Sequence, residues 1–235
     1  MRLGSVWEMN VNGFDIKPGA NLSDALLSSA DLSDADLSSA DLSRATLTGT
    51  ILSGANLQGA QLTWAKMSRT NLSRANLSRA NLLGAKLQGA ILIGANLQGA
   101  QLTYVILQGA NLQGANLQSA NLRLGDLQGA NLTGANLSLA NLKNVNLTGA
   151  NLTGANLTGA NLQGSNLTGA NLSLANLTGA DLYAANMKVV DLRGATMPDG
   201  IIRSLPISSE TSTISIETST ISIQTSTISI QTSND

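Results

Sequence analysis

The side chains that could carry out chemistry in this sequence are few and of limited types. It contains 14 acidic and 13 basic residues but no histidine and no cysteine. Their absence removes the commonest general base, thiolate nucleophiles, disulfides and most transition-metal sites. Serine and threonine hydroxyls are abundant, but no partner is present to activate one of them as a nucleophile. We therefore expect no catalysis, no metal site and no cofactor.

Arginines recur at a fixed spacing in "QLTWAKMSRTNLSRANLSRANL", residues 61–82. Arg69, Arg74 and Arg79 are five residues apart, and Trp64 stands one step earlier. Basic and aromatic side chains gathered along one face are typical of a nucleic-acid-binding protein. Whether these four side chains share a face depends on the elements that carry them.

A five-residue repeat runs through most of the chain. From Leu22 to Met197 there are 36 consecutive pentads, with leucine at the central position in 33 and methionine in three. Alanine stands two residues earlier in 29 pentads, and Asn or Asp directly before the central residue in 26. Glycine follows two residues after it in 18.

Neither a helix nor a straight strand can bury these leucines together. On an α-helix five residues advance by about 500°, so successive leucines would face every direction. On a flat strand an odd spacing alternates between the two sides. A chain that turns by about 90° once per pentad instead points every leucine and alanine to one axis, and four pentads close a square. Squares of this kind stack through hydrogen bonds between coils.

Proline and glycine are placed as this architecture requires. Pro18, Pro198 and Pro206 all lie outside the 36 pentads, where they remove no donor from the hydrogen-bond ladder. Glycine after the central residue suits a corner, because a type II turn needs a positive φ at its third residue.

The pentads "ANLQGANL", "ADLSSADL" and "ANLTGANL" resemble the A(D/N)LXX motif of the pentapeptide repeat proteins, over residues 20–199. The resemblance implies an all-β fold: a right-handed quadrilateral parallel β-helix of about nine coils of four pentapeptides. It also implies a bacterial origin, with cyanobacteria especially rich in the family, and a possible homodimer through the C-terminal end of the rod.

The ends of such a rod are open strand edges and need covers. We expect residues 1–19 to form an N-terminal cap, with a partner-binding arm as the alternative. Its large apolar side chains are Val6, Trp7, Met9, Val11, Phe14 and Ile16. Residues 200–210 are expected to be a C-terminal cap or linker, in which Ile201, Ile202 and Leu205 could cover the other end.

Residues 211–235 form a separate low-complexity tail. It contains three seven-residue copies, "TSTISIE", "TSTISIQ" and "TSTISIQ". On a straight strand the isoleucine pairs fall on opposite sides from copy to copy, so no single apolar face results. The composition therefore predicts a disordered or weakly extended tail.

With four pentads per coil, residues separated by four pentads lie above one another, and residues one pentad apart lie on adjacent faces. Arg69, Arg74 and Arg79 then point from three faces, which is not the arrangement of a nucleic-acid stripe. Arg44 stands four pentads before Trp64, and we expect a cation–π contact between them. The densest group of acids in the sequence is Asp31, Asp34, Asp36 and Asp41. The same spacing places most of them on different faces of the rod.

One side of the predicted rod carries many of the departures from the repeat, and we call it the decorated face. It consists of Arg44, Trp64, Lys66, Lys86, Tyr104, Ile106, Arg123, Leu124, Lys143, Asn144 and Tyr183. The inward small position beside it departs in four successive coils, as Val105, Gly125, Val145 and Ser165. Aromatic and arginine side chains anchor protein interfaces, which makes this face a candidate partner-binding site. The alternative is drift among duplicated repeats, since "GANLQGAQLT" occurs at both 54–63 and 94–103.

Charge helps to separate the possible functions. Seven of the 14 acids lie between Glu8 and Asp41, whereas residues 45–180 hold seven basic side chains and one acid. Some members of the family mimic DNA and bind DNA gyrase or topoisomerase, conferring quinolone resistance, which requires an acidic surface. The basic middle of this rod disfavours that alternative, and its scattered charges do not predict nucleic-acid binding.

The sequence thus predicts a non-catalytic scaffold that offers a rigid face to a protein partner of unknown identity. Some cyanobacterial relatives are thought to act in this way in regulation. No apolar run approaches the ~18 residues of a membrane span, and the N-terminal segment does not resemble a secretory signal. We therefore expect no membrane association and a cytoplasmic location.

Overall fold

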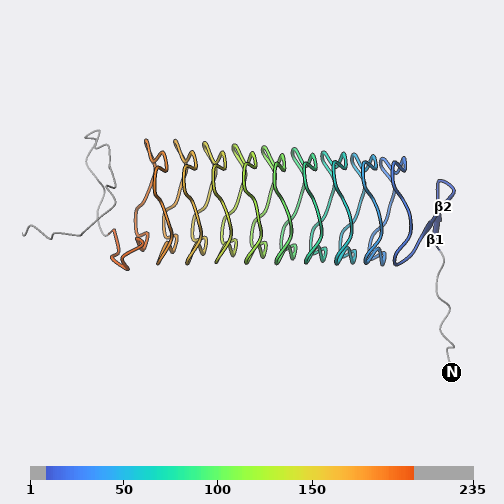
Figure 1. The fold of residues 1–235 in the computed structure, drawn as a ribbon, viewed down its shortest axis with the longest axis horizontal. Helices are drawn as coiled ribbons and strands as arrows, with labels where there is room; N and C mark the ends of the chain where they lie inside the picture. The colour runs from blue at the N-terminus through green and yellow to red at the C-terminus, as the bar shows by residue number, and fades with distance from the viewer. Residues whose placement is uncertain (1–8, 204–235) are drawn as a thin grey trace, which may run out of the picture.

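The computed structural model describes residues 9–203 and shows a rod of stacked turns (Figure 1). From Asn21 onward each pentad contributes one bridge residue and one two-residue turn. The bridges are parallel and join residues four pentads apart, from Asn21 with Asp41 to Asn176 with Thr196. The predicted coil of four pentads is therefore confirmed. The right hand of the coil and the total of nine coils stay predictions.

The corner of each coil is a tight turn closed by the backbone. The amide N–H of Ala25, for example, donates to the carbonyl of Leu22 at 3.1 Å. The third residue of the turn has a positive φ whether it is glycine, as at Gly84 (63°), or another residue, as at Trp64 (59°). A positive φ is what the third position of a type II turn requires, so the role predicted for glycine is confirmed.

Each side of the coil contains only one β-bridge residue, because two residues of every pentad form the turn. Adjacent coils are joined on each side by bonds such as Leu82 N to Gln101 O (2.7 Å) and Asn81 N to Ala60 O (2.9 Å). Within residues 9–203 the extended strands are confined to β1 (Met9–Val11) and β2 (Phe14–Ile16).

The axis of the rod is filled by the repeated apolar residues. Every central leucine from Leu27 to Leu177 is at most 1% exposed, as are the inward alanines from Ala40 to Ala175. A core of many small, identical layers explains how a chain with 2% aromatic residues can bury enough apolar surface to fold.

The N-terminal end is covered by the antiparallel hairpin of β1 and β2, seen at the blue end of Figure 1. Asn12 and Gly13 form its turn, both with positive φ, as a two-residue type I′ hairpin requires. Ile16 is buried, and Val11 and Phe14 pack against the core. Val6 and Trp7, which we also expected in the cap, lie outside the described residues.

The C-terminal end is built differently from the expectation. The chain turns back after Met197, and Ile202 pairs antiparallel with Thr196. Ile201 and Ile202 nevertheless remain 63% and 60% exposed, so the prediction that these side chains cover the end is wrong. Leu205 and the tail 211–235 lie outside the described residues.

Where Asn or Asp precedes the central residue, its side chain fixes the turn that follows. The side-chain oxygen of Asn71 accepts the backbone N–H of Ser73 at 3.1 Å, and the carboxylate of Asp41 does the same with Ser43 at 2.9 Å. Hydrogen bonds from the serine hydroxyl and backbone two residues on lower the pKa of Asp31, Asp36 and Asp41 below the ordinary value. Asparagine offers the same acceptor without a charge.

Acid is expected to loosen the N-terminal coils. Because the folded pKa of these carboxyls is lowered, their contribution to stability is present above their ordinary pKa. It is lost as the pH falls through the folded value, below about pH 4. The variant D31N/D36N/D41N keeps the acceptor, and its melting temperature should fall less than that of the wild type between pH 7 and pH 3. Equal losses in thermal unfolding followed by circular dichroism would contradict this role.

The core contains one buried hydroxyl without a partner in the described region. Ser165 is 1% exposed and its Oγ forms no hydrogen bond, whereas the Oγ1 of buried Thr50 donates to Leu27 O at 2.6 Å. Replacing Ser165 by Ala should raise the free energy of unfolding by about 1 kcal/mol, because an unsatisfied polar group is removed. Thr50→Val, the matched control, should lower it by a similar amount. Chemical denaturation measures both, and a destabilised S165A would refute the assignment.

Candidate interaction face

Residues four pentads apart lie above one another in the rod, and this places the residues of the decorated face in neighbouring columns. Lys66 bridges Lys86, which bridges Ile106, so these side chains follow one another along one side of the rod. Beside this column, the amide of Tyr104 donates to Arg123 O and that of Leu124 to Lys143 O, both at 3.1 Å. Most of the face is exposed, although Ile106, Leu124 and Lys143 are half-buried.

Trp64 and Tyr104 are the aromatic corners of this face. Their side chains are 54% and 52% exposed, and their φ values are 59° and 58°. A residue other than glycine costs about 1 kcal/mol in this conformation. The cost does not single out the face, because Leu139 and Leu174 occupy the same conformation at other corners.

The glycine between the two aromatic corners has a specific role that the sequence analysis missed. Gly84 lies one coil after Trp64 and is buried, and a Cβ placed on it would overlap the indole ring. The indole therefore lies over the coil between Trp64 and Tyr104. The available signal was the position of Gly84 in the column between two aromatic residues.

Arg44 makes a different contact from the one expected. Its Nε and Nη2 donate to the two carboxylate oxygens of Asp24 at 2.9 and 2.6 Å. This pairing lowers the pKa of Asp24 and raises that of Arg44. Because Arg44 reaches the preceding coil and the Trp64 ring covers the following one, the predicted cation–π contact is wrong. Arg44 belongs to the face by position, but its charge is already paired.

Asp126 is a second residue that the sequence analysis left out of the face. It bridges Ile106 and so continues the column of Lys66 and Lys86. Its carboxylate accepts hydrogen bonds from Gln108 Nε2 (2.6 Å) and Asn146 Nδ2 (3.0 Å). The basic column therefore ends at an acid. Asn144 and Tyr183 are exposed at the far end of the face.

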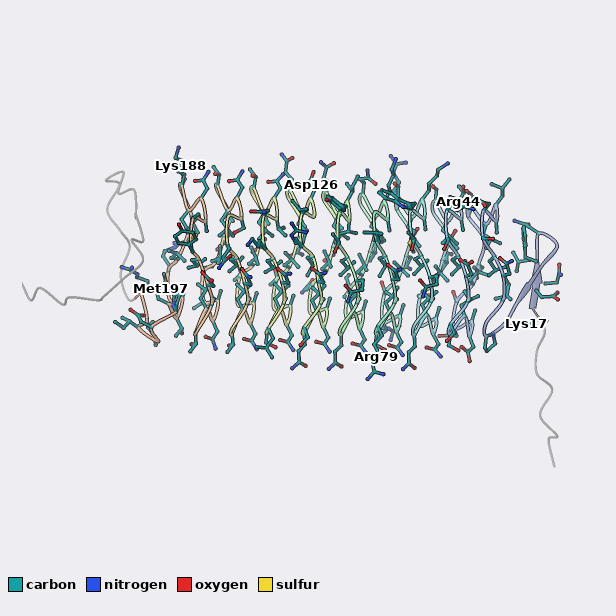
Figure 2. The ribbon with its side chains drawn as sticks, viewed as in Figure 1. Lys17, Arg44, Arg79, Asp126, Lys188 and Met197 are labelled. Atoms are coloured by element: carbon teal, nitrogen blue, oxygen red, sulfur yellow. The ribbon has the colours of Figure 1, made fainter. Side chains whose placement is uncertain are left out.

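The arginines of the central coil do not form a stripe. Arg69, Arg74 and Arg79 occupy three successive corners, with φ values of 57° to 59°. Figure 2 shows Arg44 near the upper edge and Arg79 near the lower edge of the rod in that view. Within residues 9–203 no group of three or more His, Cys, Asp or Glu side chains is arranged to hold a metal ion. The same region has no helix that is long and apolar enough to cross a bilayer.

The inward departures beside the face are explained by packing. A Cβ on Gly125 would lie 3.2 Å from Cγ1 of Val105, which fills the space that an alanine would otherwise occupy. Val105 and Val145, both buried, flank Gly125 in the preceding and following coils. Larger and smaller side chains therefore compensate along the axis, and no external partner is needed to account for this column.

The Trp64–Gly84 contact can be tested against an unhindered glycine. Gly109 has a φ of 62°, like the 63° of Gly84, but a Cβ on it would meet nothing within 4 Å. Gly109→Ala should cost about 1 kcal/mol from backbone strain alone. Gly84→Ala should cost about 1–3 kcal/mol more, because the Cβ displaces the indole.

A double-mutant cycle provides the control for this prediction. In a W64G background, G84A should cost no more than G109A does in the wild type, as measured by denaturant unfolding. Equal costs of G84A and G109A in the wild type would show that the indole does not rest on Gly84.

Comparison with known families agrees with the repeat. The family model of pentapeptide repeats matches in eight copies, over residues 19–54, 55–94, 95–134, 120–159 and 155–194. This match indicates no catalytic family. No curated protein matches the chain.

Three solved structures are among those to which the chain is similar. HetL, a pentapeptide repeat protein involved in heterocyst differentiation regulation from the cyanobacterium Nostoc sp. strain PCC 7120, is 37% identical over 75% of this chain and 91% of its own (TM-score 0.42). Full-length QnrB1, a plasmid-mediated fluoroquinolone resistance protein, is 21% identical over 78% and 88% (TM-score 0.47). The protein alr5209, also from Nostoc, is 32% identical over 42% and 84% (TM-score 0.37). With the family model matching most of residues 19–194, the chain belongs to the pentapeptide repeat family.

Proposed function

We propose that this protein is a non-catalytic scaffold whose decorated face docks a protein partner. The observation that carries the proposal is the gathering of two exposed aromatic corners, Trp64 and Tyr104, beside the exposed Lys66, Lys86 and Arg123 on one side of the rod. Aromatic and arginine side chains of this kind supply most of the binding energy in protein interfaces. A regulatory role is what the resemblance to the family adds.

The rod that presents this face is proposed to be right-handed, with nine coils over residues 20–199. A backbone hydrogen-bonded from coil to coil holds the side chains of the face at fixed spacings. Docking on such a surface loses little conformational entropy, so a modest number of contacts can give specific binding.

The charge distribution supports a protein partner over DNA mimicry. Between Arg44 and Lys143 the rod carries eight basic residues and Asp126 as the one acid. A surface that imitates DNA needs acids along its length, which these coils lack. The basic side chains of the face instead favour a partner with acidic groups at its rim.

Corner glycines allow the proposal to be tested without damaging the fold. The variant W64G/Y104G/R123Q removes two aromatic side chains and one charge from the face, and its two glycines stand where the backbone has a positive φ, so its stability should be maintained. The matched control L139G/L174G/R74G makes the same kind of change at other corners. Affinity capture from a native lysate should recover a partner with the wild type and the control, at a yield reduced by about tenfold or more with the face variant.

Two results would overturn the proposal. One is equal recovery by the face variant and the wild type, which would place binding elsewhere on the rod. The other is the absence of any partner with the wild type, which would favour drift among duplicated repeats as the origin of the decorated face. Circular dichroism of all three proteins checks that the rod is retained.

A further inference from the structure

Within residues 9–203, the last coil has backbone amides without a hydrogen-bond acceptor. In the internal coils each central residue donates to a carbonyl of the following coil, as Leu162 N does to Asp181 O at 2.8 Å. Within residues 9–203 the amides of Leu182, Met187 and Leu192 have no backbone acceptor. The fourth side is closed, because Met197 N donates to Ile201 O and Arg203 N to Ala195 O, at 2.8 and 2.9 Å. Three sides of this end therefore present an open edge in the described part of the chain.

Apolar side chains surround the same open edge. Val189 is 89% exposed, at a corner with a φ of 56°. Met187 and Val190 are only partly buried, although their counterparts in the internal coils are covered. Leu182, Leu192 and Met197 of the same coil are at most 8% exposed, so the exposed apolar surface of this end is centred on Met187, Val189 and Val190. Exposed apolar side chains beside unpaired edge groups form a surface that native proteins normally cover.

The chain beyond this edge has a pattern suited to covering it. In the copy 211–217, Ser212, Ile214 and Ile216 alternate with Thr211, Thr213 and Ser215. Alternation of this kind is typical of a strand with one apolar and one polar face. On a straight strand the seven-residue period reverses the faces from copy to copy. A turn of the chain at the seventh residue of each copy (Glu217, Gln224 and Gln231) would let the isoleucines of all three copies face the same side. The corners of the pentads do the same for the central leucines.

We propose that residues 211–231 of the same chain cover the open end of the rod and pair with its unpaired amides. The isoleucines face the core end and the threonines face solvent. The connection is short, because the chain already lies on the edge at Arg203 and residues 204–210 span up to about 23 Å. An occupant tethered this closely acts at an effective concentration of about millimolar, which favours the chain's own segment over a second copy.

Hydrogen exchange of the full-length protein tests this assignment. The amides of Leu182, Met187 and Leu192 should be protected in the wild type. A full-length variant with Ile214, Ile216, Ile221, Ile223, Ile228 and Ile230 replaced by Ser should exchange them about tenfold faster or more. The amides of Leu82 and Leu122, in the middle of the rod, should exchange at the same rate in both proteins.

A matched variant distinguishes the proposed faces of the tail. Replacing Thr211, Thr213, Thr218, Thr220, Thr225 and Thr227 by Ser changes six residues on the other face of the copies and should preserve the protection. Unprotected amides in the wild type would refute the proposal. Protection that disappears on dilution, together with a dimer mass in light scattering, would assign the edge to a second copy. Concentration-independent protection of a monomer, lost only in the isoleucine variant, is the expected result.

Discussion

The fold depends on bringing a leucine to the same axis once every five residues. The chain meets this requirement with a corner in every pentad, and the corner requires a positive φ at one residue. Because two residues form the corner, each side keeps only one bridge residue, and stability comes from stacking coils rather than from long strands. The outward residues take no part in the core, so they can vary without loss of the rod.

The coil and its columns could be predicted because the period alone fixes them. What the period does not fix is the direction in which a long side chain leans along the rod. Arg44 has a possible partner in both neighbouring coils, and it contacts the carboxylate of Asp24. Trp64 leans the other way, over Gly84, because only a residue without a Cβ leaves room for the indole.

The two ends differ in how well the sequence described them. The hairpin of β1 and β2 has an Asn-Gly turn and apolar side chains that pack on the core, and both are visible in the sequence. At the other end we expected Ile201 and Ile202 to bury their side chains. The chain there instead uses backbone groups of residues 201–203 to pair one edge of the last coil.

The hydrogen-bonded spacing of four pentads also separates two kinds of sequence change. Inserting or deleting a whole coil lengthens or shortens the rod and leaves every column in place. Inserting or deleting a single pentad preserves the core equally well, yet it rotates everything that follows by a quarter turn. The side chains of the decorated face would then be divided between two sides of the molecule. A rod of this kind can therefore have one of its faces divided in a single step while its core stays intact.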